Sequence, residues 1–169
     1  MHINIEIKAH CPNPEQVKAL LEAKKADFKG IDHQIDTYFS AAKGRLKLRQ
    51  GNIENTLIHY QRENQAGPKQ SDVNLYHPQN TAALKAVLDN ALESLVVVDK
   101  LRAIYFIDNV KFHVDEVKNL GHFVEIEAID RDGTLGIAQL KTQCECYMQY
   151  LNITSDALVE RSYSDLLLM

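Results

Sequence analysis

The chain has 169 residues, of which 45% are hydrophobic and 25% charged, and its net charge is -4. A single domain of this size, residues 1–169, buries roughly 70% of its unfolded surface and needs no disulfides. The negative charge disfavours a general nucleic-acid surface, and the lack of a long apolar run disfavours a membrane partner. Three cysteines, an odd number, without an apolar leader segment are typical of a reducing compartment, so we expect a cytoplasmic protein.

The first predicted element is a strand with two different faces. In the opening stretch INIEIKAH, Ile5 and Ile7 alternate with Asn4, Glu6 and Lys8. This period of two is typical of a strand with one apolar and one polar face. The polar face either meets solvent or lines an interior that requires charge.

The remaining elements are expected in chain order as a meander of strands with a few helices. A helix is predicted to begin near residue 14, with two prolines at its start. Alternating or β-branched runs predict further strands at residues 33–41, 44–51, 54–63, 71–77, 94–107, 109–117 and 122–129. Helical patterns cover residues 80–92 and 133–152, and residues 162–169 resemble a short docking segment. Short turns between successive strands predict an antiparallel sheet or barrel with helices, an α+β fold.

Charged residues gather on one face of several of these strands. The groups that share a face are Arg45 with Lys47 and Arg49, Lys100 with Arg102, and Glu125 with Glu127. One such strand alone is explained by a solvated outer face. Several together favour a barrel whose polar faces all point inward, which would give a lumen with both basic and acidic clusters.

A lumen of mixed charge suits a polyanion that is bound together with a metal ion. Lysine and arginine side chains bind the oxygens of a triphosphate. Magnesium prefers oxygen ligands, often one or two carboxylates together with phosphate oxygens and waters. A bound cation lets acidic side chains and an acidic substrate share one cavity.

Six stretches then carry a family resemblance over nearly the whole chain. They are NIEIK, QIDTYF, GRLKLR, VVDKLRAIYF, KFHVDEVKNLGHFVEIE and SYSDLLL, in the expected order. Together they resemble the CYTH or triphosphate tunnel metalloenzyme superfamily, and IHYQRENQAGPKQSDV and RSYSDLL are more similar to its class IV adenylyl cyclase (CyaB-like) branch than to its triphosphatases. The resemblance implies an antiparallel β-barrel tunnel of about eight strands with flanking helices.

The resemblance also implies roles for individual residues. By position, the metal ligands would be Glu6, Asp115, Glu125 and Glu127. The triphosphate contacts would be Lys8, Lys47, Arg49, Arg62, Lys69, Lys100 and Arg102. Lys100 and Tyr38 would act near the departing phosphate, although Tyr38 could equally close the barrel wall with its hydroxyl bonded to Asp36.

One position departs from the family signature Glu-x-Glu-x-Lys. Asn4 stands where the first glutamate is expected, while Glu6 and Lys8 match. An amide oxygen can contact a metal but brings no charge, so weaker metal binding is expected. His113 lies on the same strand face as Asp115 and is expected to be a wall residue.

Three functions are compatible with these residues. The first is an adenylyl cyclase, a lyase that converts ATP to cyclic AMP and pyrophosphate with Mg²⁺ or Mn²⁺. The second is a metal-dependent triphosphatase acting on thiamine triphosphate or inorganic tripolyphosphate. The third, suggested by Asn4, is a weakly active module that binds nucleotides or polyphosphate. The residues leave open the substrate, the metal, the effect of Asn4 on activity, and whether the protein forms a homodimer.

Overall fold

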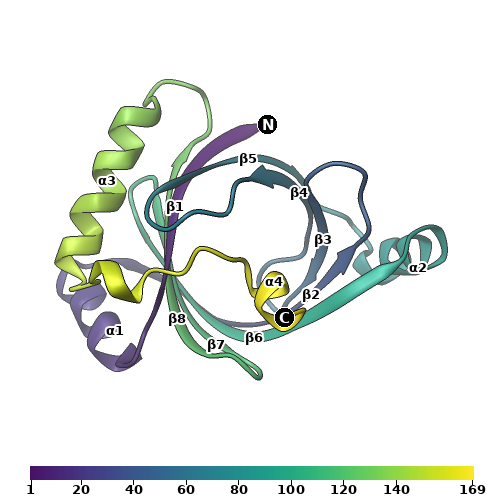
Figure 1. Ribbon diagram of the computed structural model, residues 1–169, viewed down its shortest axis with the longest axis horizontal. Coiled ribbons are helices and arrows are strands. Elements are labelled where there is room, and N and C mark those ends of the chain that lie inside the picture. The colour runs from purple at the N-terminus through teal and green to yellow at the C-terminus, as the bar shows by residue number, and fades with distance from the viewer.

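The computed structural model describes residues 1–169 and contains eight strands. The strands are β1 (His2–His10), β2 (Asp27–Phe39), β3 (Arg45–Gln50), β4 (Thr56–Arg62), β5 (Lys69–Tyr76), β6 (Ser94–Ile107), β7 (Val110–Val117) and β8 (Gly121–Asp130). All neighbouring strands pair antiparallel and close into a barrel in the order β1-β5-β4-β3-β2-β6-β7-β8 (Figure 1). The predicted α+β barrel is therefore confirmed.

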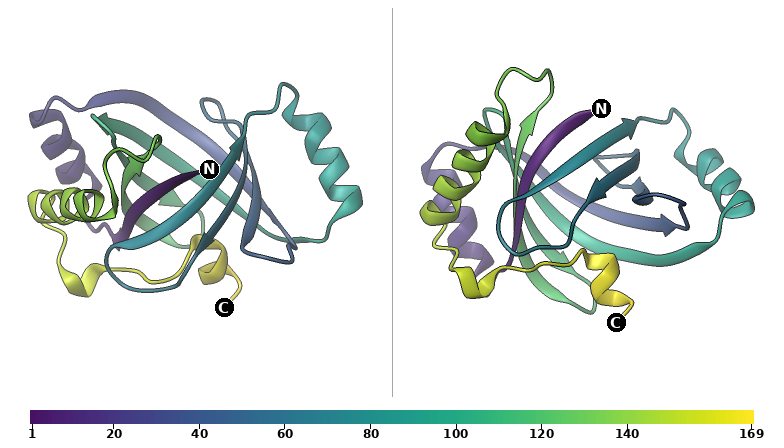
Figure 2. Two further views of the ribbon diagram at one scale, coloured as in Figure 1. Left: turned by 90° about the horizontal axis from the view of Figure 1, so that it is seen from above. Right: turned by 45° about the horizontal axis from the view of Figure 1, so that its top comes forward.

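The helices lie outside the barrel or across its end. They are α1 (Pro14–Ala23), α2 (Thr81–Ala91), α3 (Ile137–Tyr150), the 3-10 turn η1 (Ser155–Ala157) and α4 (Tyr163–Leu167). Figure 2 shows α1 and α3 together on one side of the barrel and α2 on the other. None of the helices combines the length and the hydropathy that crossing a membrane would require.

The two faces of β1 meet different surroundings. Ile5 and Ile7 point outward and are buried beneath the helices, whereas Glu6 and Lys8 line the cavity inside the barrel. The strand therefore buries both faces, one in an apolar layer and one in a charged lumen. Its alternating sequence is explained by two interiors of opposite polarity rather than by a solvated face.

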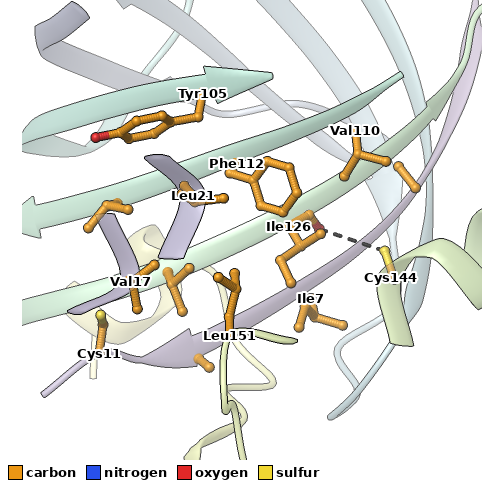
Figure 3. Close-up of a cluster of buried hydrophobic side chains, with 14 of the residues drawn as sticks. Ile7, Cys11, Val17, Leu21, Tyr105, Val110, Phe112, Ile126, Cys144 and Leu151 are labelled. Atoms are coloured by element: carbon orange, nitrogen blue, oxygen red, sulfur yellow. Dashed lines mark hydrogen bonds between the residues drawn. The ribbon is translucent and has the colours of Figure 1, made fainter. Parts of the chain in front are cut away.

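The main apolar core lies between the helices and the outer face of the barrel. α3 packs on β1 and β8, and α1 packs on β7 and β8. Phe112, Ile126 and Leu21 are fully buried in this cluster (Figure 3). The thiol of Cys144 donates to the carbonyl oxygen of Ile5 at 3.0 Å. This layer fixes the strands whose opposite faces carry the acidic side chains of the lumen.

The C-terminal segment crosses one end of the barrel (Figure 1). It pairs with β1 through the backbone N–H of Val159, which donates to the carbonyl of Lys8 at 2.8 Å. A capping box of Ser162 and Asp165 starts α4. Contacts to three further strands are Lys69 Nζ to Val159 O, Tyr163 Oη to Asp115 Oδ2, and Arg45 Nη2 to Asp165 Oδ2. Because these strands lie around the ring, the segment closes that end, as the predicted docking role requires.

Candidate active site

The barrel encloses a cavity of about 350 Å³ that is lined by side chains from all eight strands. Its basic lining residues are Lys8, Lys47, Arg49, Arg62, Lys100, Arg102, Lys111 and Arg131. Its acidic lining residues are Glu6, Glu54, Glu125 and Glu127. A chain with net charge -4 thus concentrates an excess of positive charge inside its barrel, which is the distribution that an anionic ligand requires.

The cavity has a closed basic end and an open end. On β1, Lys8 is nearest the C-terminal segment, and Glu6, Asn4 and His2 follow toward the other end. The ammonium group of Lys8 lies 3.9 Å from the ring centroid of Tyr163 in the closing segment. Exposed lining residues mark the opening, and they are Leu75, His77 and Arg131. Apolar lining near this opening comes from Ile58, Val73, Phe106 and Ile129.

Asp36 on β2 organises the basic residues of the neighbouring strands. Its fully buried carboxylate accepts two bonds of 2.9 Å from Arg49 and one of 2.8 Å from Lys100, and Lys47 lies 3.1 Å away. Burial alone would raise the pKa of Asp36, but these three cations outweigh it and hold the pKa well below its ordinary value. Burial lowers the pKa of Lys100 to about 7 although Asp36 opposes the shift.

Tyr38 lies on the same face of β2 as Asp36 and lines the cavity. Its hydroxyl accepts a hydrogen bond of 3.3 Å from Lys47. Burial, followed by the charge of Asp36, raises the pKa of Tyr38 to about 12. At neutral pH the hydroxyl therefore keeps its proton and can donate a hydrogen bond to an anion.

The structure places Asp115 differently from the sequence-based expectation. Its carboxylate is fully buried and accepts two hydrogen bonds from Arg102, of 2.7 and 2.6 Å. It accepts a third hydrogen bond, of 2.7 Å, from the hydroxyl of Tyr163. Asp115 is not among the residues that line the cavity. It acts as the counter-ion of Arg102 and a support for the closing segment, so it is separate from the candidate metal ligands.

Glu6, Glu125 and Glu127 do meet at one wall, where β1 pairs with β8. Glu6 forms an ion pair with Arg62, and Glu125 lies 3.4 Å from Lys8 and 3.1 Å from Arg102. A nitrogen of His113 and one oxygen each of Glu125 and Glu127 lie within 4.8 Å of one another.

The acidic wall suits a divalent cation. Burial, followed by the charge of Glu6, raises the pKa of Glu127 to about 7, and Glu125 adds to the shift. Asn4 is buried two residues from Glu6, and its Oδ1 has no hydrogen-bond partner. Converging carboxylates and a free amide oxygen form an oxygen-rich donor set of the kind that Mg²⁺ or Mn²⁺ binds. A cation here would relieve the repulsion between the carboxylates.

Lys69 is also placed differently from the expectation. Its fully buried ammonium group donates to the backbone carbonyls of Val159 and Glu160, each at 3.1 Å. The residue is absent from the cavity lining. Lys69 therefore fastens the closing segment to β5, and its predicted contact with the phosphates has no support in this geometry.

Three charged lining residues were missed in the sequence analysis, and they are Glu54, Lys111 and Arg131. Glu54 lies in the loop between β3 and β4, bonds to Arg49 at 3.2 Å and pairs with Lys111. The buried carboxylate of Asp32 holds this loop by accepting the backbone N–H groups of residues 52–54. The GNIE turn gave no periodic signal, but Lys111 shares the strand face of His113 and could have been found by alternation.

Comparisons with known proteins agree with this geometry. The model of the CYTH domain family matches residues 2–163. The PH1012 protein of Pyrococcus horikoshii OT3 is 23% identical with a TM-score of 0.82, over 98% of this chain and 99% of that one. A candidate adenylate cyclase from Vibrio parahaemolyticus is 15% identical with a TM-score of 0.79, over 99% of this chain and 98% of that one. A candidate adenylyl cyclase from Hippeastrum is 15% identical with a TM-score of 0.66, over 99% of this chain and 94% of that one. That protein is described as having a dominant triphosphatase activity. No curated protein matches the sequence.

Asp36 should be essential for stability because it neutralises buried cations. We expect Asp36→Asn to lower the free energy of unfolding by roughly 3 to 5 kcal/mol, the cost of leaving buried charges unpaired. Asp99→Asn is the matched control, since Asp99 lies on the outer face of β6 and is partly exposed beside His33. Denaturant unfolding of both variants measures the difference, and equal losses would contradict the role given to Asp36.

Asn4 should limit the affinity of the acidic wall for metal. We expect Asn4→Asp, which adds a carboxylate of nearly the same shape, to tighten Mg²⁺ binding by roughly threefold or more, because it adds a unit of negative charge. Asn74→Asp, on an exposed position of β5, controls for the overall change of charge. Calorimetric titration without nucleotide is the measurement. An identical response of the two variants would show that Asn4 does not face the cation.

Proposed function

The chain belongs to the CYTH domain family, and from this premise we propose that it is a metal-dependent adenylyl cyclase that converts ATP to cyclic AMP and pyrophosphate. Members of this family act on triphosphates, as cyclases or as triphosphatases. The observation that carries the proposal is the order of side chains along the cavity. Lys8, Lys47 and Lys100 lie toward the closed end with Glu125 beside Lys8, Glu6 and Glu127 follow along the cavity, and apolar residues lie near the opening together with Arg131.

This order matches the parts of a nucleoside triphosphate. The terminal phosphates would bind to Lys8, Lys47 and Lys100 at the closed end, with the hydroxyl of Tyr38 as a further donor. The nucleoside would lie against Phe106 and neighbouring apolar residues at the opening. The α-phosphate would then lie beside the carboxylates, which favours a reaction at the α-phosphorus over one at the terminal phosphorus.

In the proposed reaction the ribose 3′-oxygen forms a bond to the α-phosphorus. The bond from that phosphorus to the bridging oxygen breaks, pyrophosphate leaves, and the 3′-hydroxyl loses its proton to solvent or a carboxylate. Lysine and arginine side chains hold the pyrophosphate oxygens, where negative charge grows as the bond breaks. Closure of one end by Tyr163 and its segment limits access of water to the phosphates.

Glu6, Glu125 and Glu127 would hold the divalent cation, Mg²⁺ or Mn²⁺, with the amide of Asn4 nearby. When bound, the cation supplies positive charge to the triphosphate and favours deprotonation of the attacking hydroxyl. The side chains of this chain position the substrate, balance its charge and exclude water from the closed end.

A triphosphatase is the second candidate, and a specific observation favours it. Tyr38, Lys47 and Lys100 meet at the closed end, where the terminal phosphate of any triphosphate would lie. Donors gathered around a terminal phosphate can also assist its transfer to water. The Hippeastrum protein with the same fold is described as having this dominant activity.

The reaction products distinguish the two candidates. The protein is incubated with ATP, thiamine triphosphate or tripolyphosphate and with Mg²⁺ or Mn²⁺, and the products are separated by chromatography. Cyclic AMP with an equal amount of pyrophosphate is the expected result. Orthophosphate as the main product would replace the cyclase with the triphosphatase, and binding without turnover would leave only the third function, a binding module.

Glu127→Gln tests whether turnover takes place in the lumen. We expect turnover to fall by at least about tenfold, because the variant removes a carboxylate that would hold the cation. Glu116→Gln is the matched control, since Glu116 lies on the exposed outer face of β7, and it should retain activity within about twofold. Equal activity of the two variants would remove the lumen as the reaction site.

A further inference from the structure

The loop of residues 51–55, between β3 and β4, carries the carboxylate of Glu54 into the cavity. The fully buried carboxylate of Asp32 fixes this loop by accepting the backbone N–H groups of residues 52–54 at 2.6 to 2.9 Å. Gly51 permits the close approach, since a Cβ atom there would lie 2.7 Å from both oxygens of Asp32. The backbone therefore holds Glu54 in the lumen independently of what its side chain contacts.

The carboxylate of Glu54 is shared between two cations. Its Oε1 accepts hydrogen bonds of 3.2 Å from Nη1 of Arg49 and 3.0 Å from Nε2 of Gln34, and its Oε2 pairs with Lys111. Nε and Nη2 of Arg49 donate to Asp36 at 2.9 Å each. The guanidinium group of Arg49 thus lies between two carboxylates, and Lys111 has Glu54 as its ion-pair partner.

Arg49 and Lys111 extend toward the opening of the cavity. Lys111 is paired across the sheet with Phe106, and its Nζ lies 5.7 Å from the centroid of that ring. Arg49 is paired with Thr56 of β4, whose hydroxyl lies 3.4 Å from Nδ1 of His77 at the opening. Two cations therefore stand where the proposed function places the uncharged nucleoside.

The balance of charge differs between the two ends of the cavity. Toward the closed end, the single carboxylate of Asp36 faces Arg49, Lys47 and Lys100, so positive charge is left over for a ligand. Toward the opening, Glu54 balances Lys111 and also faces Arg49. A phosphate group near the opening would meet the repulsion of Glu54 together with the attraction of these cations.

We propose that Glu54 is a specificity residue that keeps phosphate groups out of the open half of the cavity, and that it thereby favours a nucleoside triphosphate over an inorganic polyphosphate chain. The inference rests on the proposed function, which places the phosphates at the closed end and the nucleoside at Phe106. An uncharged nucleoside is not repelled by a carboxylate and gains apolar contacts there. A further phosphate in the same place gains no such contacts and is repelled.

The alternative role for Glu54 is only to hold Arg49 and Lys111 in place. In that case its removal would disorder two cations and weaken the binding of every anionic ligand. A role in excluding phosphate predicts a change of the opposite sign, and one that is confined to ligands with a phosphate near the opening. The sign of the change and its dependence on the ligand separate the two roles.

The test measures the binding of tetrapolyphosphate and of a non-reactive ATP analogue to Glu54→Gln and to the wild-type protein. Three phosphates of either ligand fit the closed end, and the fourth phosphate of tetrapolyphosphate replaces the nucleoside. We expect Glu54→Gln to raise the affinity for tetrapolyphosphate by about tenfold or more, and the affinity for the ATP analogue by less than about threefold. Calorimetry at one fixed Mg²⁺ concentration gives both affinities.

A second substitution identifies the cation that the variant sets free. Adding Lys111→Met to Glu54→Gln should abolish most of the gain for tetrapolyphosphate, whereas Lys111→Met alone should change that affinity by less than about threefold, because Glu54 already balances Lys111. Glu93→Gln is the matched control for the change of charge, since Glu93 is exposed between α2 and β6, and it should leave both affinities unchanged. Thermal unfolding confirms that each variant is folded.

The outcomes separate this inference from the proposed function. An unchanged or lower affinity of Glu54→Gln for tetrapolyphosphate, or an equal gain for both ligands, would overturn the specificity role of Glu54. A gain that survives the addition of Lys111→Met would overturn it as well, because the new phosphate contact would then lie elsewhere. A wild-type protein that binds neither ligand would instead overturn the proposed function.

Discussion

Two buried carboxylates, Asp36 and Asp115, make the charged interior of this barrel physically tolerable. Asp36 forms ion pairs with Arg49 and Lys100, and Asp115 forms an ion pair with Arg102. Without such partners, cations in a low-dielectric wall would lose their hydration without compensation. With them, guanidinium and ammonium groups are held in fixed positions around the cavity before any ligand arrives. Preorganised charge of this kind needs little rearrangement when an anion binds.

The same constraint explains why the apolar core is outside the barrel. Since much of the lumen is charged, β1, β7 and β8 bury their outer apolar faces against α1 and α3. β1 shows the arrangement most clearly, with isoleucines packed beneath the helices and Glu6 and Lys8 in the lumen. The helices thus stabilise the wall that holds the candidate metal ligands, although no helix contributes a ligand to it.

Much of the fold and part of the site could be predicted from the sequence, because alternation assigns each residue to a face of its strand. It placed Glu125 and Glu127 in the lumen, where the structure has them. Alternation gives neither depth along the barrel nor the choice of partner. The family resemblance, which carries roles over by position, implied a metal contact for Asp115 and a phosphate contact for Lys69. In the structure Asp115 is bound to Arg102 and Tyr163, and Lys69 holds the closing segment. Glu54 was missed because a loop without periodicity carries it into the cavity.

The central claim is that a nucleoside triphosphate enters the lumen with its phosphates toward the closed end. A crystal structure with a non-reactive ATP analogue and Mn²⁺ tests it most directly. We expect the terminal phosphates beside Lys8 and Lys100 near Tyr163, the cation at Glu127, and the base beside Phe106 at the opening. Phosphates at the opening with the base at the closed end, or an analogue bound outside the barrel, would contradict the claim.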